Sequence, residues 1–286
     1  MTAAASTSED PGLWKTLTAR PAVLVALVVF GAILAAAILA PWIAPADPAR
    51  MSVRARLSPP LGDYIFGADA FGRDVLSRLL FAGRVSLSIG LGVAVLSTAL
   101  GIVIGLAAGF FRRLDAPLSR LIDAMMAFPD ILLAIALVAI LGGSAANVVL
   151  ALSIVYTPRI ARIVRAATLV IRELPYVEAA RALGSSNLSI MVWHVLPNIV
   201  SPITVQATFI FAYAMLAEAG LSFLGVGVDP SIPTWGTMVN EGRQYIDQAL
   251  YLILFPGIAI SLAVLSLQLI GDGLRDALDP RLAKDV

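Results

Sequence analysis

The sequence predicts an all-α integral membrane protein with about six transmembrane helices. Its 286 residues are 59% hydrophobic and only 14% charged, and the mean hydropathy is +0.90. A soluble domain of this size carries roughly 25% charged residues, so lipid must cover much of this protein's surface. Uncharged stretches close to the ~20 residues that cross a bilayer as a helix recur along the chain.

The first uncharged stretch, 21–46, is too long for the core of a signal peptide and suits a spanning helix. A polar cytoplasmic tail is expected before it, at 1–20, and an extracytoplasmic polar segment after it, at 47–84. The membrane core is expected at 85–271, and a short charged cytoplasmic tail at 272–286. The chain is therefore expected to cross the membrane several times within one domain.

Further spans within the core are expected at 85–111, 121–141, 147–165, 196–225 and 249–270. The uncharged window between Asp130 and Arg159 is too short for two full spans, so the fourth span must carry Arg159 inside its own end. Gly101, Gly105 and Gly109 lie four residues apart on one face of the second span. Small residues on one face allow two helices to approach closely in lipid.

Charge and composition set the orientation and exclude several classes of protein. Thirteen of the 20 Lys and Arg residues fall on segments that lie inside the cell if both termini are cytoplasmic, and cytoplasmic segments carry the excess of these residues. The absence of cysteine and the single histidine, His194, exclude thiol chemistry and a multi-His metal site within this chain. A net charge of +1 gives no basic stripe for nucleic acid.

The segment 172–197, between the fourth and fifth spans, is longer than a simple connection requires. Pro175 suits the first turn of a helix, and Gly184 is the usual residue for a left-handed helix end. A Ser or Asn among 185–187 then caps a second helix. The first helix offers alanines rather than the basic face and bulky anchors of an interfacial helix, which suits insertion into a groove of another protein.

The spacing of this segment is specific. Glu178-Ala179-Ala180 is followed by Gly184 and then by Val195-Leu196-Pro197. This pattern resembles the EAA loop of the permease subunits of binding-protein-dependent ABC importers. The general family pattern has an aliphatic residue where this chain has His194, and a histidine there is usual in the dipeptide and oligopeptide branch.

Two other segments are similar to the DppC/OppC-type permeases of that branch. The run from Phe66 to Arg78 resembles their GTDxxGRDxxSR segment, with Ala68 in place of the usual Thr. The run from Glu218 to Gly225 resembles their EAxLSFLG stretch, and Trp235-Gly236 their downstream Trp-Gly. The resemblance covers about residues 20–280, nearly the whole chain.

The resemblance implies a type I ABC importer permease fold in the bacterial cytoplasmic (inner) membrane. This chain would form half of a pore for dipeptides and short oligopeptides, with nickel or haem as the cargo of related importers. The partners would be a second, DppB/OppB-like permease, two ABC ATPase subunits and an extracytoplasmic peptide-binding protein. Glu178, Ala179, Ala180 and Gly184 would dock on an ATPase. ATP and Mg would be bound by the ATPases, since this chain has no GxxxxGK[ST] loop, no cofactor of its own and no enzymatic role.

Two charged positions outside the loop leave alternatives open. Asp69, Gly72, Arg73 and Asp74 are expected either to form ion pairs within the chain or to contact the binding protein, and the first is preferred. Glu218 is expected either on the translocation path, against a peptide's amino terminus, or bonded to a neighbouring subunit.

Charges near the span ends are expected to be neutralised locally. Asp123 and Asp130 are expected to pair with nearby bases, with Arg112, Arg113 and Arg120 as candidates. The arginines at 159, 162 and 165 share a stripe that is expected to contact lipid headgroups. His194 is expected to make a satisfied polar contact rather than to act as a pH switch.

Two rival classes are disfavoured. An ion-coupled secondary transporter would show buried acids near the midplane, often within an inverted repeat. A membrane enzyme would show a catalytic cluster. The sequence shows no repeat, its acids lie near span ends, and its one histidine lies in the expected cytoplasmic loop.

Overall fold

Helices make up most of the part of the protein that the structure describes. The computed structural model describes residues 20–278, and within them the β-structure is one isolated bridge between Ala68 and Asp74. The tail expected at 1–20 therefore lies outside the described residues except for Arg20. The tail expected from residue 272 begins instead as the last turns of a helix that ends at Ala277, and 279–286 lie outside the described part.

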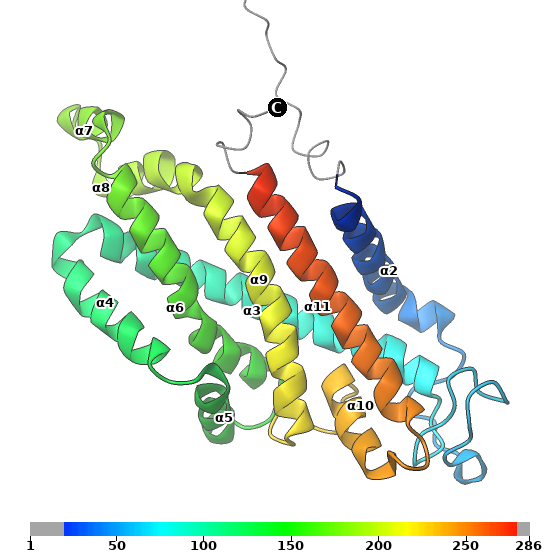
Figure 1. The fold of residues 1–286 in the computed structure, drawn as a ribbon. Helices are drawn as coiled ribbons and strands as arrows, with labels where there is room; N and C mark the ends of the chain where they lie inside the picture. The colour runs from blue at the N-terminus through cyan, green and yellow to red at the C-terminus, as the bar shows by residue number, and fades with distance from the viewer. Residues whose placement is uncertain (1–19, 279–286) are drawn as a thin grey trace, which may run out of the picture.

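The long helices form one slanted layer with a further helix behind it (Figure 1). The helices in front are α2 (Pro21–Ile43), α6 (Ala145–Ile171), α9 (Val200–Phe223) and α11 (Tyr251–Ala277). Behind them runs α3 (Val75–Phe110), which contacts α2, α6 and α9. Within residues 20–278, five helices are long and apolar enough to cross a membrane, and a bent pair makes a sixth candidate. The predicted all-α membrane fold with about six spans is confirmed.

Helix α3 begins ten residues earlier than the charge pattern indicates. The side chain of Asp74 accepts a hydrogen bond from the backbone N–H of Ser77 and so caps the helix. Arg78 and Arg84 consequently lie inside the helix, where the sequence predicts the last part of the polar segment 47–84. Arg78 is tolerated near the start of this helix because it pairs with Asp69 and Glu241 of the same chain.

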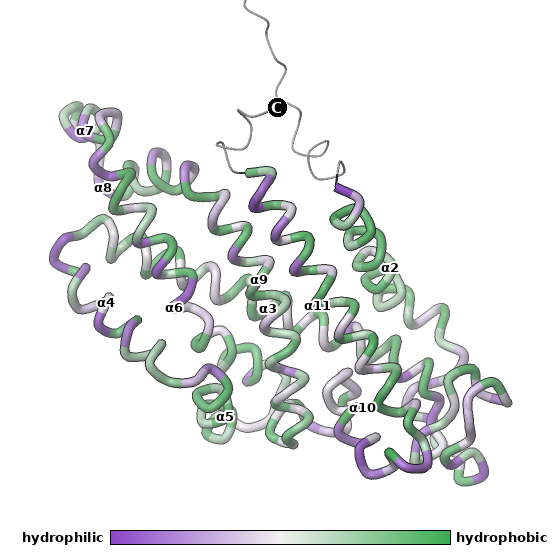
Figure 2. Tube along the Cα trace, viewed as in Figure 1, coloured by the Kyte–Doolittle hydropathy of each residue, from purple (hydrophilic) through white to green (hydrophobic). Residues whose placement is uncertain are grey.

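The third span is not a straight helix over 121–141. It consists of α4 (Arg112–Met126) and α5 (Asp130–Leu141), which meet at an angle of 93°. Pro129 lies at the break, and the residue before a proline is disfavoured in helical conformation. Figure 2 shows hydrophilic and hydrophobic residues mixed along α4, whereas α5 is hydrophobic after its first residue, Asp130.

The fourth span is confirmed as a helix that carries Arg159 within its length. Helix α6 extends from its cap, Ser144, to Ile171 and so includes the whole arginine stripe. It packs on α3 along the three glycines predicted to allow close approach. A Cβ added at Gly105 would lie 2.7 Å from the backbone oxygen of Ala161, and one at Gly109 would lie 2.9 Å from that of Arg165. The two backbones therefore touch along this seam.

An irregular segment directly precedes helix α9. The short helix α8 (Asn187–Ile190) passes into a π-helical turn, η2 (Met191–Val195), and a 3₁₀ turn, η3 (Leu196–Ile199). Pro197 and Pro202 lack a backbone N–H, so the regular helical ladder cannot form here.

The opposite end of the protein is closed by short elements. They are η1 (Val53–Ala55), α10 (Trp235–Gly242) and η4 (Arg243–Tyr245). Helix α10 starts with a capping box, in which the Thr234 side chain accepts from the Thr237 backbone and the Thr237 side chain accepts from that of Thr234. The end of the molecule that carries these elements is called the α10 end below.

Candidate functional site

The segment between α6 and α9 forms the projecting helix that the sequence predicts. Helix α7 (Pro175–Ala182) stands beyond the ends of the long helices (Figure 1). Proline occupies its first position, as expected. This end of the molecule, called the α7 end below, also carries the start of α2 and the end of α11, where Arg20 and Asp276 form an ion pair.

Gly184 closes helix α7. Its φ of +83° is left-handed, its N–H donates to the carbonyl of Arg181 at 3.0 Å, and the N–H of Ser185 donates to that of Ala180 at 3.1 Å. These two bonds are the Schellman arrangement. A Cβ at Gly184 would meet nothing within 4 Å, so glycine is required here by the backbone conformation and not by packing.

One side of α7 is buried and the other faces outward. Val177 is fully buried and Ala180 nearly so, whereas Glu178 and Ala179 are exposed. Ala180 therefore packs inward, whereas Leu183, which follows the end of the helix, is 87% exposed.

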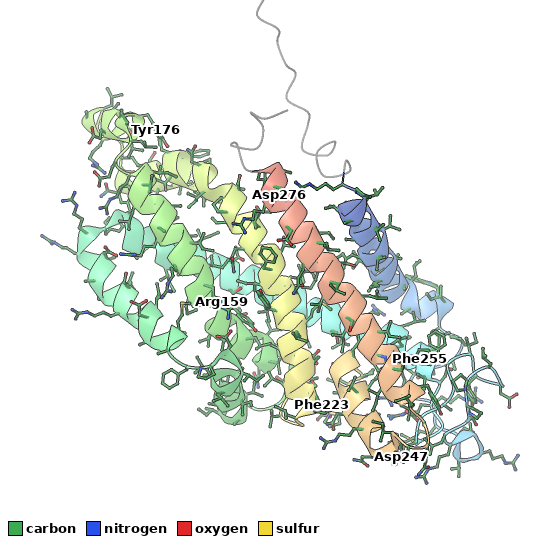
Figure 3. All side chains as sticks on the ribbon, viewed as in Figure 1. Arg159, Tyr176, Phe223, Asp247, Phe255 and Asp276 are labelled. Atoms are coloured by element: carbon green, nitrogen blue, oxygen red, sulfur yellow. The ribbon has the colours of Figure 1, made fainter. Side chains whose placement is uncertain are left out.

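Further apolar side chains are exposed around α7. Beside Leu183, the larger ones are Tyr176, Leu188 and Trp193. Tyr176 lies at the projecting tip (Figure 3). A small helix that presents apolar and acidic groups beyond the spans has the shape of a knob for another protein.

Two arginines fix α7 to the end of α3. The Arg172 guanidinium donates from Nη1 to the carbonyl of Gly109 at 2.6 Å. The guanidinium of Arg181 lies 5.8 Å from the ring centroid of Phe110. Val177 also packs in the main core, so α7 is anchored to the body of the protein by apolar as well as polar contacts.

The second half of the loop is capped as predicted. The Ser186 side chain accepts from the N–H of Ser189 and starts α8. His194 lies in the π-helical turn, and its Nδ1 is buried without a hydrogen-bond partner among residues 20–278. The satisfied polar contact expected for His194 is therefore not made by this atom.

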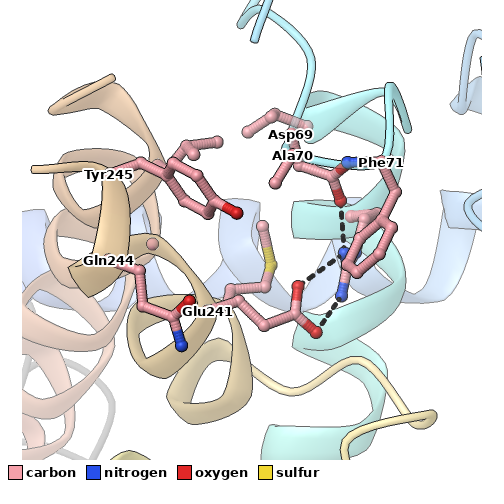
Figure 4. A pocket seen from close by; sticks show the side chains of 11 residues that line it. Asp69, Ala70, Phe71, Glu241, Gln244 and Tyr245 are labelled. Atoms are coloured by element: carbon pink, nitrogen blue, oxygen red, sulfur yellow. Dashed lines mark hydrogen bonds and ion pairs between the residues drawn. The ribbon is translucent and has the colours of Figure 1, made fainter. Parts of the chain in front are cut away.

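A buried network joins the predicted polar motif to α10. Asp69 and Glu241 share the guanidinium groups of Arg73 and Arg78, and these four residues are called the α10-end network. Arg73 Nη2 and Arg78 Nη1 each lie 2.8 Å from Glu241 Oε2. The network borders a cavity of about 180 Å³ between the motif and α10 (Figure 4).

Asp69 is held as a carboxylate in this network. Burial raises its pKa, but hydrogen bonds from the N–H groups of Arg73 and Phe71 and the charges of Arg78 and Arg73 outweigh burial. The net result is a pKa below the ordinary value of 3.8. The ion pairing preferred for Asp69 and Arg73 is thus what the structure contains.

The other two residues of that motif act on the backbone. Asp74 was grouped with the ion pairs, but it caps α3 instead, through the N–H and hydroxyl of Ser77. Gly72 has a φ of +71°, and a Cβ there would lie 1.8 Å from the carbonyl oxygen of Ser52. Both fix the loop that presents Asp69.

Glu218 lies inside this chain, not on a surface. Its side chain is 0% exposed and accepts hydrogen bonds from Ser222 Oγ at 2.8 Å and Ser86 Oγ at 3.3 Å. Ser86 Oγ in turn accepts from the backbone N–H of Trp235. In this structure Glu218 faces α3 and α10, and its hydrogen bonds are made within this chain.

The arginine stripe of α6 pairs with acids rather than with lipid headgroups, which corrects that expectation. The pairs are Arg159–Asp130, Arg162–Asp123 and Arg165–Asp115, and they are called the α6 ladder below. Asp123 and Asp130 are paired as expected, but with bases on another helix and not with Arg112, Arg113 or Arg120. Arg159 lies part-way along α6 (Figure 3). The ladder ties the bent pair α4–α5 to α6.

Two members of these clusters were not singled out from the sequence. Glu241 completes the α10-end network, and Asp115 forms the last rung of the ladder. The signal available for Asp115 was its spacing, eight residues before Asp123 and so on the same side of a helix. Glu241 gave no such signal because its partners lie more than 160 residues away.

Comparison with known proteins assigns the chain to a family. Residues 98–284 match the model of binding-protein-dependent transport system inner membrane components, and 12–60 match the N-terminal transmembrane domain of oligopeptide transport permease C. The chain belongs to this family of transport-system inner membrane components. Membership makes it a DppC/OppC-type permease subunit of an ABC importer, and a multi-pass protein of the inner membrane.

Individual relatives agree with this assignment. The chain is 52% identical over 268 residues to a putative peptide transport system permease protein of Brucella suis, covering 94% of this chain and 90% of that protein. It is 44% identical over 276 residues to the di/tripeptide transport system permease protein DppC of Pseudomonas aeruginosa, covering 94% and 91%.

A solved structure confirms the fold. The chain matches one from an inward-facing form of the MetNI methionine ABC transporter with a TM-score of 0.57 at 19% identity. The match covers 71% of this chain and 97% of the other. The type I permease fold is confirmed.

Proposed function

We propose that this permease subunit carries dipeptides and short oligopeptides into the bacterial cytoplasm and is driven through α7. The cargo is proposed because the relatives from Brucella suis and Pseudomonas aeruginosa are named for peptide and di/tripeptide transport. The partners are a second, DppB/OppB-like permease that completes the pore, an extracytoplasmic peptide-binding protein, and two ABC ATPases that bind ATP and Mg.

The exposed helix α7 is the observation that carries this proposal. Glu178 and Ala179 face outward, Ala180 packs inward, and Gly184 fixes the turn. An ATPase groove that receives this knob would push on α6 and α3 through the contacts of Arg172 and Arg181. Nucleotide state would then bias which side of the membrane the pore faces.

The placement of the ends supports a cytoplasmic location for α7 and both termini. The start of α2 and the end of α11 lie at the α7 end, where Arg20 pairs with Asp276. Two ends on one side require an even number of crossings, so α4–α5 would be the sixth beside the five long helices. The excess of Lys and Arg on the same segments favours this side as the cytoplasm.

The α10 end would then face the binding protein. The segment from Asp69 to Asp74 serves first as a structural joint, because its charges are used within the chain. Contact with the binding protein would involve the surface that this joint supports.

Reconstituted transport tests the role of α7. The chain, its partner permease, ATPases and binding protein are assembled in vesicles, and ATP-driven uptake of a labelled dipeptide is measured. Gly184→Val places a β-branched residue at a left-handed position, and Glu178→Arg reverses an exposed charge. Both variants are expected to bind the ATPases at least ~10-fold more weakly and to lose uptake, a change worth about 1.4 kcal/mol.

A matched control separates docking from folding. Gly225 has a φ of +79°, and a Cβ there would meet only Asn240 Nδ2, at an ordinary contact distance of 3.9 Å, but this glycine lies between α9 and α10. Gly225→Val is expected to leave ATPase affinity unchanged. Normal ATPase binding and uptake in both α7 variants would contradict the proposal. If the wild type took up labelled nickel or haem but not dipeptide, only the proposal about the cargo would be wrong.

A further inference from the structure

A second, positively charged cleft lies beside α7. Its volume is about 570 Å³, and it opens between the end of α3, the start of α4 and the loop that carries α7. The side chains lining it include Arg112, Arg113, Arg172, Arg181 and Glu173. Four arginines and one glutamate leave three positive charges around a space large enough for a phosphate-bearing group.

Much of this charge is not neutralised within the described chain. Arg112 is 83% exposed and lies 3.8 Å from Glu173, which also accepts a closer contact from Arg172 at 2.9 Å. Arg113 is exposed, and no acidic partner for it lies within ion-pair distance among residues 20–278. Arg181 lies over an aromatic ring, which leaves its N–H groups free to donate.

The rest of the cleft is apolar and lies where a span ends. Phe110 is the last residue of α3, and Phe111 and Leu114 follow it into the cleft wall. Helix α4 begins at Arg112 with no side-chain cap, so its first N–H groups add positive potential at the same place. Arginines above an apolar wall at a span's end match a phospholipid, whose phosphate is joined to acyl chains.

We propose that this cleft binds the phosphate headgroup of an anionic phospholipid. A guanidinium group can donate two parallel hydrogen bonds to the oxygens of one phosphate. Arg112 and Arg113 supply the exposed guanidinium groups of this cleft. The acyl chains lie along the exposed apolar side chains of α4, Leu114 and Leu121. Because Arg181 belongs to α7, an occupied cleft braces the coupling helix against α3. The site goes beyond the transport function proposed above, although it shares the cytoplasmic placement of the α7 end.

Native mass spectrometry of the purified full-length chain tests the site. The chain is equilibrated in detergent micelles that contain phosphatidylglycerol or phosphatidylcholine, and retained lipid is counted. The variant Arg112→Gln/Arg113→Gln removes two exposed charges from the cleft, each worth about fivefold in affinity for an anionic surface. Its affinity for phosphatidylglycerol is expected to fall about 25-fold, with retention of phosphatidylcholine unchanged.

The matched control is Arg54→Gln/Arg56→Gln, which removes two exposed arginines from the α10 end. It is expected to keep wild-type affinity for phosphatidylglycerol. Equal retention by the wild type and the cleft variant would overturn the proposal, as would an equal loss in the control. Both variants replace exposed residues, and a thermal melting curve of each verifies that the chain remains folded.

Two further arms identify the source of the phosphate. In lipid-free micelles, inorganic phosphate is compared with chloride at equal ionic strength, and no shift in melting temperature specific to the wild type is expected. A shift as large as that given by phosphatidylglycerol would assign the cleft to a free anion. In the complex with the ATPases, bound phosphatidylglycerol is expected to remain. Its release on assembly would assign the cleft to an acidic surface of the ATPase instead.

Discussion

Arginine–carboxylate pairs join parts of this protein at two places, and the two sets are built differently. In the α10-end network, two carboxylates share two guanidiniums, and the Arg78 side chain is 3% exposed. In the α6 ladder each arginine has one acid, and the side chains of the middle rung, Arg162 and Asp123, are 52% and 65% exposed. Shared, desolvated charges make a fixed joint, whereas exposed single pairs are weak and can separate.

The difference fits what each set connects. The network fastens the motif before α3 to α10. The ladder fastens α6 to a bent pair of helices whose own connection, at residues 127–129, is short and non-helical at Pro129. A transporter needs both a fixed frame and contacts that can be exchanged between two states. The comparison therefore predicts unequal responses when charges are removed.

The largest effect is expected from Arg78→Leu. This change leaves Asp69 and Glu241 with Arg73 alone, so a buried carboxylate loses its main partner. The free energy of unfolding is expected to fall by about 3 kcal/mol. Thermal unfolding in detergent measures it, and Arg162→Leu in the ladder is the comparison. Similar losses in the two variants would show that the network is no more fixed than the ladder.

The second largest effect is expected from a fall in pH, which weakens the α10-end network. The pKa of Asp69 is lower in the folded protein than in the unfolded chain, so the folded state binds the proton less readily. The carboxylate therefore contributes stability above its ordinary pKa of 3.8, and the contribution is lost as the pH falls through the lower folded value.

Asp69→Asn removes that contribution. Its melting temperature is expected to lie below that of the wild type at neutral pH and to depend less on pH below about 4. Asp123→Asn, in the ladder, serves as the control. If the wild type and Asp69→Asn lost stability in parallel on acidification, Asp69 would not be the group that responds.

The smallest effect is expected in the ladder. A double-mutant cycle on Arg162→Ala and Asp123→Ala is expected to give a coupling of about 0.5 kcal/mol, decreasing with added salt. The swapped pair, Arg162→Asp with Asp123→Arg, is expected to recover most of it. A coupling above about 2 kcal/mol, insensitive to salt, would make this rung as firm as the network.

The sequence predicts local features of this protein well. Pro175 and Gly184 delimit α7, because proline at a first turn and glycine at a left-handed end act within a few residues. Gly101, Gly105 and Gly109 likewise indicated the close approach of α3 and another helix. Family spacing added the expected docking role of the loop, which the transport assay above tests.

Features that depend on distant residues were not predicted. The sequence predicts Arg78 in a polar segment because its partner Glu241 lies 163 residues away, and a charge whose partner is distant in sequence indicates the end of a span. For the same reason the arginines of α6 were assigned to lipid. The buried position of Glu218 likewise depends on Ser86, which lies 132 residues away in the sequence.

The glycine seam has a mechanical consequence. Where α3 and α6 touch, a Cβ at Gly101 would lie 2.4 Å from the Cβ of Ile160, so any larger residue at this position would push the two helices apart. Helices α3 and α6 are therefore tightly packed against each other. Because α7 is joined to α6 by the chain and to α3 through Arg172, we expect a push on α7 to move both helices together. We then expect the hinges of the conformational change at the borders of the α3–α6 pair with α4–α5, α9 and the partner subunit.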